Sequence, residues 1–360
     1  MEIKKPIRIL HVVTYMGRGG LETMLMNYYR HMDRDKVQFD FLVHRDFAAD
    51  YDAEILSLGG RIYRLPKLNP VSIKYLQALD RFFEKHHEYR IVHSHLDCMA
   101  GIPLRFAKKH GIPVRIAHSH ASSQTKDWKY VIKVFYKRKI HQYATNLFAC
   151  SEAAGRWMFG KKAFCILHNA IDTKCFTSNL EERNAVRNEL AIPADALVIG
   201  HVGRFATPKN HSFLLRVFAR LPQNTRLLLV GDGELRNDTE KQAEQLGIRE
   251  RVFFAGIRSD VNRLLQAMDV FAFPSLYEGL GIAAIEAQAA GLPCLISDGV
   301  PIACKVTDLV QQLPLAEEMW EKEIVAATVR QKENTYHQIC DAGYDICANA
   351  AKLQSFYETV

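Results

Sequence analysis

The sequence predicts an α/β protein built from two doubly wound, parallel β-sheets. Its 360 residues are more than one hydrophobic core usually holds, so we expect two domains. Short runs rich in β-branched and aromatic residues alternate with amphipathic stretches, and this alternation begins a second time after a polar segment at residues 168–184. Alternating strands and helices are typical of parallel sheets that helices cover on both faces.

Each predicted domain has its own run of strands. The first domain, residues 1–168, has strand candidates at 7–13, 37–43, 61–65, 91–95, 114–120 and 146–151. Amphipathic stretches such as 21–32 and 71–86 lie between most of them. The second domain, residues 185–338, has strand candidates at 197–204, 226–231, 251–256, 269–275 and 293–297. The segment between the domains is polar and irregular, and we assign residues 169–184 to a linker.

The composition is that of an ordinary soluble globular protein, with 48% hydrophobic and 24% charged residues. The longest apolar runs are far shorter than the ~18–20 residues of a membrane-spanning helix. The start, "MEIKKPIRILHVV", lacks a small-residue cleavage site, so it predicts a first strand rather than a signal peptide. Eight scattered cysteines without a CxxC pair indicate reduced thiols in a cytoplasmic protein.

Positive charge is concentrated in the first half of the chain. Residues 1–170 carry 28 Lys and Arg against 15 Asp and Glu, whereas the remainder carries 19 against 25. This asymmetry predicts that the first half meets an anionic partner. Nucleic acid, a phosphorylated substrate and an anionic membrane surface all fit the charge by itself.

Unusual residues gather in the loops after predicted strands, where open α/β sheets bind their ligands. Gly17, Gly19 and Gly20 come after the first strand and would present backbone N–H groups at a helix start, although a plain glycine-rich turn has the same composition. Arg204 and Lys209 share one loop of the second domain. They could hold a single diphosphate or remain two solvated cations.

The stretch "FPSLYEGLGIAAIEAQAAG" (273–291) places two carboxylates in an otherwise apolar segment. Glu278 comes after a strand, and the glycine turn next to it opens a helix whose backbone N–H groups suit phosphate oxygens. Glu286 lies about one turn into that helix, and a carboxylate accepts paired hydroxyls such as those of ribose. The pattern predicts one site for a phosphate and two sets of hydroxyls. In the alternative interpretation there is no ligand site: Glu286 caps or pairs locally, and Glu278 lies on the surface.

Taken together, "VGRFATPKN", "GDGE", "FAG" and "FPSLYEGLGIAAIEAQAAGLP" resemble the motifs of the retaining glycosyltransferases of family four. The spacing E-x7-E from Glu278 to Glu286 is the signature of that family. "GRGGLE", "RIAHSH" and "LHNAIDTKCF" agree with it, so the likeness covers nearly the whole chain. Bacterial exopolysaccharide and capsule enzymes are the members that the sequence resembles most. Asn169-Ala170, where the family usually has glycine, is a departure that affects the turn of the linker.

The resemblance implies the GT-B fold, in which two Rossmann-like domains face each other across a cleft. It also implies two groups of site residues. The catalytic group holds the donor diphosphate and the reacting sugar, and it consists of His118, Arg204, Lys209 and Glu278. The substrate-binding group contacts the donor, with Gly19, Gly20 and the backbone N–H groups of 279–282 directed to its phosphates. It consists of Gly19, Gly20, Gly203, Ile257, Gly279, Leu280, Gly281, Ile282 and Glu286. His120 is a second candidate for the role of His118, because alternate residues of a strand point to the same side.

Within these groups, Arg204 and Lys209 are expected to neutralise the leaving diphosphate. Glu286 is expected to bind ribose hydroxyls, Glu278 hydroxyls of the donor sugar, and the main chain near Ile257 the base. The implied reaction moves a sugar, with UDP-sugar favoured as donor, to a glycan or a polyprenyl-diphosphate-linked acceptor, with retention and without a metal or other cofactor. No nucleic acid takes part in it.

Two further segments bear on partners. Residues 339–360 have apolar residues at helical spacing, and in this fold the last helix returns to the first domain. "KDWKYVIKVFYKRKIHQY" (126–143) predicts a basic amphipathic helix with the apolar stripe Trp128, Val131, Ile132 and Phe135, beside Lys126, Lys129, Lys133 and Lys137. Such a helix can dock on an anionic membrane, at the inner face of the cell membrane, or pack on the sheet of its own domain.

Other activities fit parts of the sequence. A nucleotide-sugar epimerase of the same fold would bind the same donor and need no acceptor. "HSH" at 93–95 and again at 118–120 could chelate zinc in a metal-dependent hydrolase, for which Asp97 is the nearby carboxylate. A non-catalytic binder of sugar nucleotides is a third alternative. Product analysis with the donor alone would separate these activities.

Overall fold

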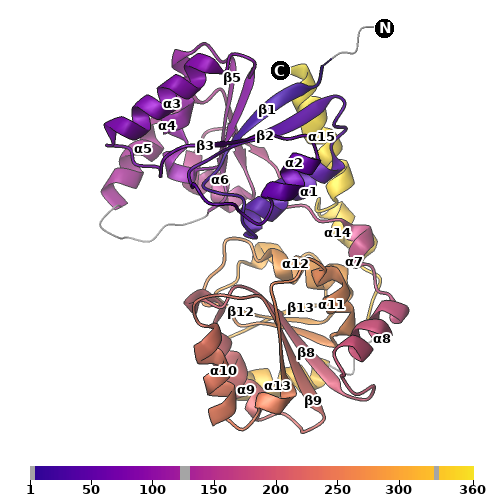
Figure 1. The fold of residues 1–360 in the computed structure, drawn as a ribbon. Coiled ribbons are helices and arrows are strands. Elements are labelled where there is room, and N and C mark those ends of the chain that lie inside the picture. The colour runs from indigo at the N-terminus through magenta and orange to yellow at the C-terminus, as the bar shows by residue number, and fades with distance from the viewer. Residues whose placement is uncertain (1–4, 122–129, 328–331) are drawn as a thin grey trace. The chain divides into compact units, whose positions relative to one another are not determined.

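The computed structural model describes residues 5–121, 130–327 and 332–360. It divides the chain into two compact units, the first formed by Met1–Ile171 together with Gly343–Val360 and the second by Asp172–Ala342. Each unit has one parallel sheet with helices on both faces, as predicted (Figure 1). Trp128, Lys126 and Lys129 of the predicted amphipathic stripe lie outside the described residues.

The sheet of unit 1 has the strand order β3-β2-β1-β4-β5-β6-β7, and all of its pairings are parallel. The strands are β1 Ile7–Val12, β2 Val37–Val43, β3 Ile62–Arg64, β4 Ile91–Ser94, β5 Val114–Ser119, β6 Asn146–Ala149 and β7 Cys165–Ile166. The helices of this unit are α1 Gly20–His31, α2 Asp52–Ser57, α3 Ile73–Lys85, α4 Gly101–Lys109, α5 Tyr130–Tyr143, α6 Glu152–Phe159 and α15 Ile346–Thr359.

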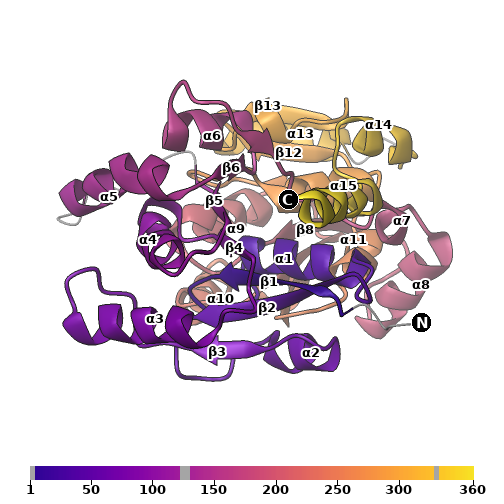
Figure 2. The same cartoon turned by 90° about the horizontal axis from the view of Figure 1, so that it is seen from above.

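Two hydrophobic clusters cover the two faces of this sheet. One contains side chains of α3, α4, α5 and α6, and the other contains side chains of α1, α2 and α15. The C-terminal helix α15 therefore returns to the first unit, where it lies beside α1 (Figures 1 and 2). Its inner side chains, including Ile346, Leu353 and Tyr357, are buried because the helical spacing places them on one face.

The sheet of unit 2 has the strand order β10-β9-β8-β11-β12-β13. The strands are β8 Leu197–Val202, β9 Thr225–Val230, β10 Val252–Gly256, β11 Val270–Phe273, β12 Cys294–Ser297 and β13 Val310–Leu313. The helices are α7 Thr173–Phe176, α8 Leu180–Glu189, α9 His211–Ala219, α10 Arg236–Gln245, α11 Val261–Ala267, α12 Ile282–Ala289, α13 Glu317–Ala327 and α14 Tyr336–Asp341. Among the described helices, none combines the length and the apolar character that a membrane crossing requires.

Three details of the sequence prediction were wrong. The segment 168–184 is not irregular, because it contains α7 and the start of α8. Asp172 and Asn179 accept hydrogen bonds from the first turns of these helices, and such polar caps look like loop residues in a sequence. The short strands β7 and β13 were missed at the ends of their sheets. β7 has only two residues, and β13 has the sequence VQQL, whose two glutamines do not look like a buried strand.

In both units the strand order reverses beside the first strand, between β1 and β4 in unit 1 and between β8 and β11 in unit 2. At such a reversal the loops on either side run in opposite directions and leave space for a ligand. The loops after these four strands contain most of the residues predicted to be functional. The topology therefore selects the same loops as the sequence motifs did.

Candidate functional site

In unit 2, Lys209 and Glu278 form an ion pair beyond the carboxyl ends of β8 and β11. The Lys209 Nζ donates to Glu278 Oε1 at 2.5 Å, and it lies 4.6 Å from the centroid of the Phe273 ring. The two side chains are only 20% and 13% exposed. Gly203 leaves room for the aliphatic part of the Lys209 side chain, because a Cβ at this glycine would lie 3.1 Å from Lys209 Cδ and Cε. The structure thus holds a cation and a carboxylate in one half-buried site.

The N-terminus of α12 lies directly after Glu278. Gly281 has a φ of +86°, a conformation that residues with side chains rarely adopt, and it turns the chain into the helix that begins at Ile282. The backbone N–H groups of Gly279, Leu280, Gly281 and Ile282 have no acceptor in the described part of the chain. Unpaired N–H groups and the helix dipole make this turn suitable for an anion.

Glu286 lies in the second turn of α12 and is half-buried. Burial raises the pKa of its carboxyl group to about 7, since desolvation penalises the charged form. Its side chain makes no hydrogen bond or ion pair with any residue that the structure describes. A carboxylate that lacks a protein partner is available to hydroxyl groups of a ligand.

Arg204 does not join Lys209 in this structure. Its guanidinium pairs with Glu234 at 3.0 Å, and its side chain is 70% exposed. The loops that carry Arg204 and Glu234 approach closely because Gly231, with a φ of +132°, has no Cβ to collide with the carbonyl of Gly203. Ile257, the residue expected near the base, is exposed directly after β10.

The glycine-rich loop of unit 1 leads into α1. Gly19 is the N-cap of this helix without a side-chain cap, and the N–H groups of Gly20 and Leu21 find no acceptor among the residues described. The Glu22 carboxyl group folds back over Gly19, where a Cβ would collide with it, and burial raises the pKa of this carboxyl. The loop therefore presents donors and one acid at the carboxyl end of β1.

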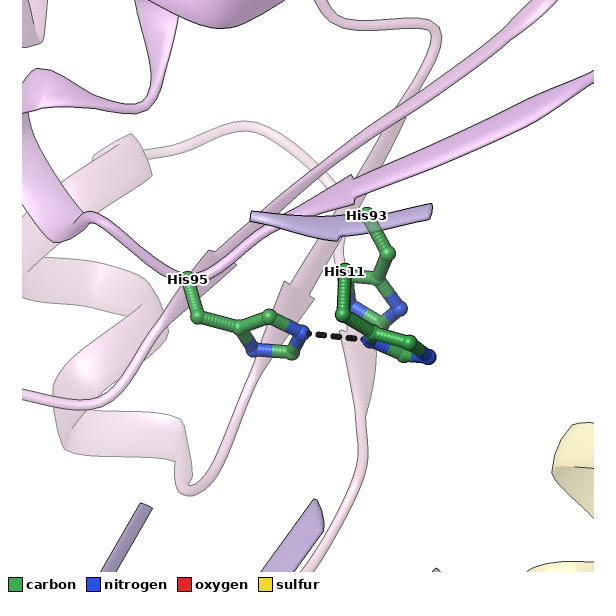
Figure 3. A group of neighbouring side chains, drawn as sticks. All are labelled: His11, His93 and His95. Atoms are coloured by element: carbon green, nitrogen blue, oxygen red, sulfur yellow. Dashed lines mark hydrogen bonds between the residues drawn. The ribbon is translucent and has the colours of Figure 1, made fainter. Parts of the chain in front are cut away.

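Five histidines gather at the carboxyl ends of β1, β4 and β5 of unit 1. Figure 3 shows His11, His93 and His95, of which His11 Nδ1 and His95 Nε2 share a hydrogen bond of 3.0 Å. The other two members are His118 and His120, whose ring centroids lie 4.1 Å apart. The prediction that these two rings lie on one side of β5 is confirmed.

The rings form two hydrogen-bonded chains. His11, His95 and His120 form one, with His95 Nδ1 2.9 Å from His120 Nε2. His93 and His118 form the other, with His93 Nε2 3.1 Å from His118 Nδ1. Burial lowers the pKa of all five imidazoles, to about 3 for His11 and His120, so the rings are neutral at pH 7.

The ring nitrogens of two triplets, His11 with His93 and His95, and His95 with His118 and His120, lie within 4.8 Å of one another, a spacing that would allow a metal ion. The carboxylate that the hydrolase alternative invoked, Asp97, belongs to neither triplet. It accepts the backbone N–H of His120 instead, and burial raises its pKa to about 6.

Helix α5 presents apolar side chains to solvent. Val131 is 75% and Phe135 is 52% exposed, and Ile132 is also exposed. Lys139 lies 4.1 Å from the centroid of the Phe135 ring, so positive charge accompanies the apolar stripe. Ile140 is buried in the unit, which shows that the helix packs through another part of its surface.

Comparison with known proteins places this geometry in a family. Residues 182–321 match the family described as "Glycosyl transferases group 1", and residues 19–163 match a "Glycosyl transferase 4-like domain". "Putative glycosyltransferase EpsF" of Bacillus subtilis is 38% identical, and the match covers 97% of this chain and 96% of the relative. The chain is a group 1 glycosyltransferase.

Further comparisons agree with this assignment. The glycosyltransferase is 28% identical to "UDP-Gal:alpha-D-GlcNAc-diphosphoundecaprenol alpha-1,3-galactosyltransferase" of Escherichia coli, over 81% of this chain and 79% of the relative. Among solved structures, Anabaena HepE in complex with UDP and glucose superposes with a TM-score of 0.81 at 18% identity, over 98% of this chain and all of the other. The fold is therefore GT-B, as expected, and the enzyme is a glycosyltransferase.

Sequence reasoning found the loop residues but missed most of the histidine chains. It identified the two HSH motifs separately and overlooked His11. Since β1 and β4 pair in parallel with His11 opposite His93, the three motifs meet on one face of the sheet. β1, β4 and β5 are neighbours in the sheet although β2 and β3 come between them in the chain. Histidines near the carboxyl ends of all three strands were the signal that could have revealed the cluster.

Proposed function

We propose that this glycosyltransferase moves a sugar from a nucleotide-diphosphate sugar, with UDP-sugar favoured, to a glycan or polyprenyl-diphosphate-linked acceptor in bacterial exopolysaccharide or capsule synthesis. The observation that carries the proposal is the Lys209–Glu278 pair beside the open N-terminus of α12. A cation and unpaired N–H groups suit a diphosphate, and a neighbouring carboxylate suits sugar hydroxyls.

Each group has a task in the proposed site. Lys209 and the N–H groups of Gly279–Ile282 bind the diphosphate and stabilise the charge that develops as it leaves. Glu286 accepts the ribose hydroxyls and Glu278 accepts hydroxyls of the sugar. Arg204, which is largely exposed, exchanges Glu234 for the diphosphate when the donor binds. The family resemblance assigns His118 of unit 1 to the reacting face of the sugar.

We further propose that the reaction proceeds with retention and without a metal. The bond between the anomeric carbon and the diphosphate oxygen breaks, and the acceptor oxygen bonds to the same face of that carbon. The departing phosphate oxygen takes the proton of the acceptor hydroxyl. This internal-return route needs no carboxylate nucleophile, and it leaves both glutamates to their hydroxyl contacts.

Names of relatives support the substrate classes. The Escherichia coli relative is named for a UDP-galactose donor and a diphosphoundecaprenol-linked acceptor. A Staphylococcus aureus relative, 25% identical over 98% of this chain, is named for capsular polysaccharide biosynthesis. The solved HepE complexes contain UDP, glucose or UDP-glucose.

Incubation with a panel of nucleotide sugars and a polyprenyl-diphosphate-linked acceptor, in EDTA throughout, tests this function. We expect one UDP-sugar to give a glycosylated acceptor of unchanged anomeric configuration, measured by mass spectrometry and proton NMR. Activity that disappears in EDTA and returns with Mn²⁺ or Mg²⁺ would contradict the metal-free mechanism. An epimerised donor without acceptor, or free sugar alone, would contradict the transferase function.

We propose in addition that α5 docks on the inner face of the cell membrane and brings the enzyme to a lipid-linked acceptor. Its exposed Val131 and Phe135 would enter the interface, while Arg138 and Lys139, which follow Phe135 by three and four positions on the same side of the helix, would meet anionic headgroups.

Vesicle sedimentation tests this docking. The double variant Val131→Ser/Phe135→Ser should bind phosphatidylglycerol vesicles about tenfold more weakly than the wild type, because two apolar side chains no longer enter the interface. Val71→Ser/Ile73→Ser is the matched control, since both of its positions are exposed apolar residues elsewhere in unit 1. Equal binding of the two double variants, or no preference for anionic over phosphatidylcholine vesicles, would refute the proposal.

A further inference from the structure

The hydrogen-bonded chain that ends at His118 begins on the C-terminal helix. The hydroxyl oxygen of Tyr357 in α15 lies 2.7 Å from His93 Nδ1, and His93 Nε2 lies 3.1 Å from His118 Nδ1. All three side chains are buried. The chain thus connects a helix near the end of the sequence to the histidine that the family resemblance places at the reacting sugar.

Tyr357 sets the direction in which the hydrogen bonds of this chain are donated. A tyrosine hydroxyl has one proton to donate, and His93 Nδ1 is its sole acceptor among the residues that the structure describes. The reverse direction, in which His93 Nδ1–H donates to the hydroxyl oxygen, would leave the buried hydroxyl proton without an acceptor, which costs free energy. We therefore infer that His93 accepts at Nδ1 and that its neutral ring carries the proton on Nε2. That N–H donates to His118 Nδ1, so the neutral ring of His118 also carries its proton on Nε2. Burial keeps both rings neutral by holding their pKa well below the usual value.

The far end of the chain is open. His118 Nε2 is buried and has no partner within the described part of the protein. A buried N–H group without an acceptor costs free energy, which a ligand oxygen would recover on binding. The second chain contrasts with this one, because neither His11 Nε2 nor His120 Nδ1 has a partner that would fix its direction.

We propose that Tyr357 and His93 are positioning residues that fix the tautomer of His118 and make it a hydrogen-bond donor to an oxygen of the bound sugar substrate. His118 is then not a general base, because its only unshared ring nitrogen already carries a proton. The choice of ligand rests on the proposed function, whereas the tautomer does not.

Nitrogen-15 NMR of histidine side chains in the free enzyme tests the tautomer directly, with signals assigned through His93→Gln and His118→Gln. We expect protonated Nε2 and unprotonated Nδ1 at His118. In Tyr357→Phe, which removes only the hydroxyl, His118 should become a mixture of both tautomers. Tyr28→Phe is the matched control, since its hydroxyl donates at 2.8 Å to the carbonyl of His168 in the same unit and lies outside the chain.

Kinetics give the second measurement. Tyr357→Phe should lower kcat about tenfold, the effect of one neutral hydrogen bond, with KM for the donor little changed. Tyr28→Phe should keep the wild-type kcat. An Nδ1–H tautomer of His118 in the wild type, or an unchanged tautomer in Tyr357→Phe, would overturn the proposal even if the transferase function holds. Stoichiometric zinc binding at the His93 and His118 nitrogens would overturn it as well. If Tyr357→Phe did not fold, the wild-type tautomer would decide.

Discussion

Replacing Lys209 with methionine is expected to lower kcat by roughly two to three orders of magnitude, the range seen when one preorganised transition-state contact is lost. Methionine keeps much of the length and the apolar stem of lysine but removes its charge. The Lys209 ammonium is held in place by Glu278 at 2.5 Å and by the Phe273 ring, so it needs little reorganisation when the diphosphate leaves. Steady-state kinetics with the donor identified by the panel would measure the effect.

Two controls separate the possible causes of such a loss. Lys241→Met makes the same change on the exposed surface of α10 and should leave kcat unchanged. Lys209→Met also leaves the half-buried Glu278 carboxylate unpaired, and this charge would repel a diphosphate. The double variant Lys209→Met/Glu278→Gln should therefore recover part of any loss in donor binding but not the loss in kcat. A kcat for Lys209→Met within threefold of the wild type would remove Lys209 from the catalytic group.

Substitutions of the two glutamates of the E-x7-E motif should change different kinetic constants. Ribose stays with the nucleotide throughout the reaction, so Glu286→Gln should mainly weaken donor binding. The sugar ring gains positive charge as its bond breaks, so Glu278→Gln should lower kcat more than it raises KM. A lost charge-assisted hydrogen bond is worth roughly 1.5–3 kcal/mol, or about ten- to more than a hundredfold.

Calorimetry with free UDP, which lacks the sugar, distinguishes the two roles. Its affinity should fall in Glu286→Gln and change little in Glu278→Gln. The opposite result would show that the assignments are reversed, and no effect from either change would remove the pair from the site.

The pH dependence of UDP binding adds a second check. The carboxyl group of Glu286 holds its proton below its pKa of about 7 and is ionised above it. A carboxylate accepts hydroxyl hydrogen bonds better than a carboxylic acid does, so the affinity of the wild type should rise with pH through about 7. Glu286→Gln should lose this part of the rise. Glu278→Gln is the control and should keep it, since the phosphates of UDP titrate equally for both variants.

Much of the fold could be read from the chain itself. The strands with long β-rich runs, such as 37–43 and 226–231, were predicted close to their observed bounds because a buried parallel strand is apolar over most of its length. β7 was missed because it has only two residues, and β13 was missed because its sequence, VQQL, has two glutamines in place of an apolar run. The caps at Asp172 and Asn179 were mistaken for loop residues, since the same polar residue types occupy both kinds of position.

The features of the candidate site also divide into those that were evident in the sequence and those that were not. The glycine turn, the E-x7-E pair and the Arg204/Lys209 loop were evident in the sequence, because backbone conformations with positive φ and helix starts require particular residues at fixed spacing. Which cation pairs with which acid was not evident. Lys209 meets Glu278 and Arg204 meets Glu234, and these partners are 69 and 30 positions apart along the chain.

The sequence by itself determined the α/β class, the two domains, the family resemblance and the loops that carry the site, because all of these depend on local periodicity and on residues at short spacing. Only the tertiary structure decided the ion pairs, the raised pKa of Glu286 and the chain from Tyr357 through His93 to His118. These features depend on strand register and on burial. His11 and His93 meet because β1 and β4 pair in one register, and Tyr357 reaches them because α15 packs on the same face of the sheet. No local pattern records such contacts, since their members are separated by tens to hundreds of residues.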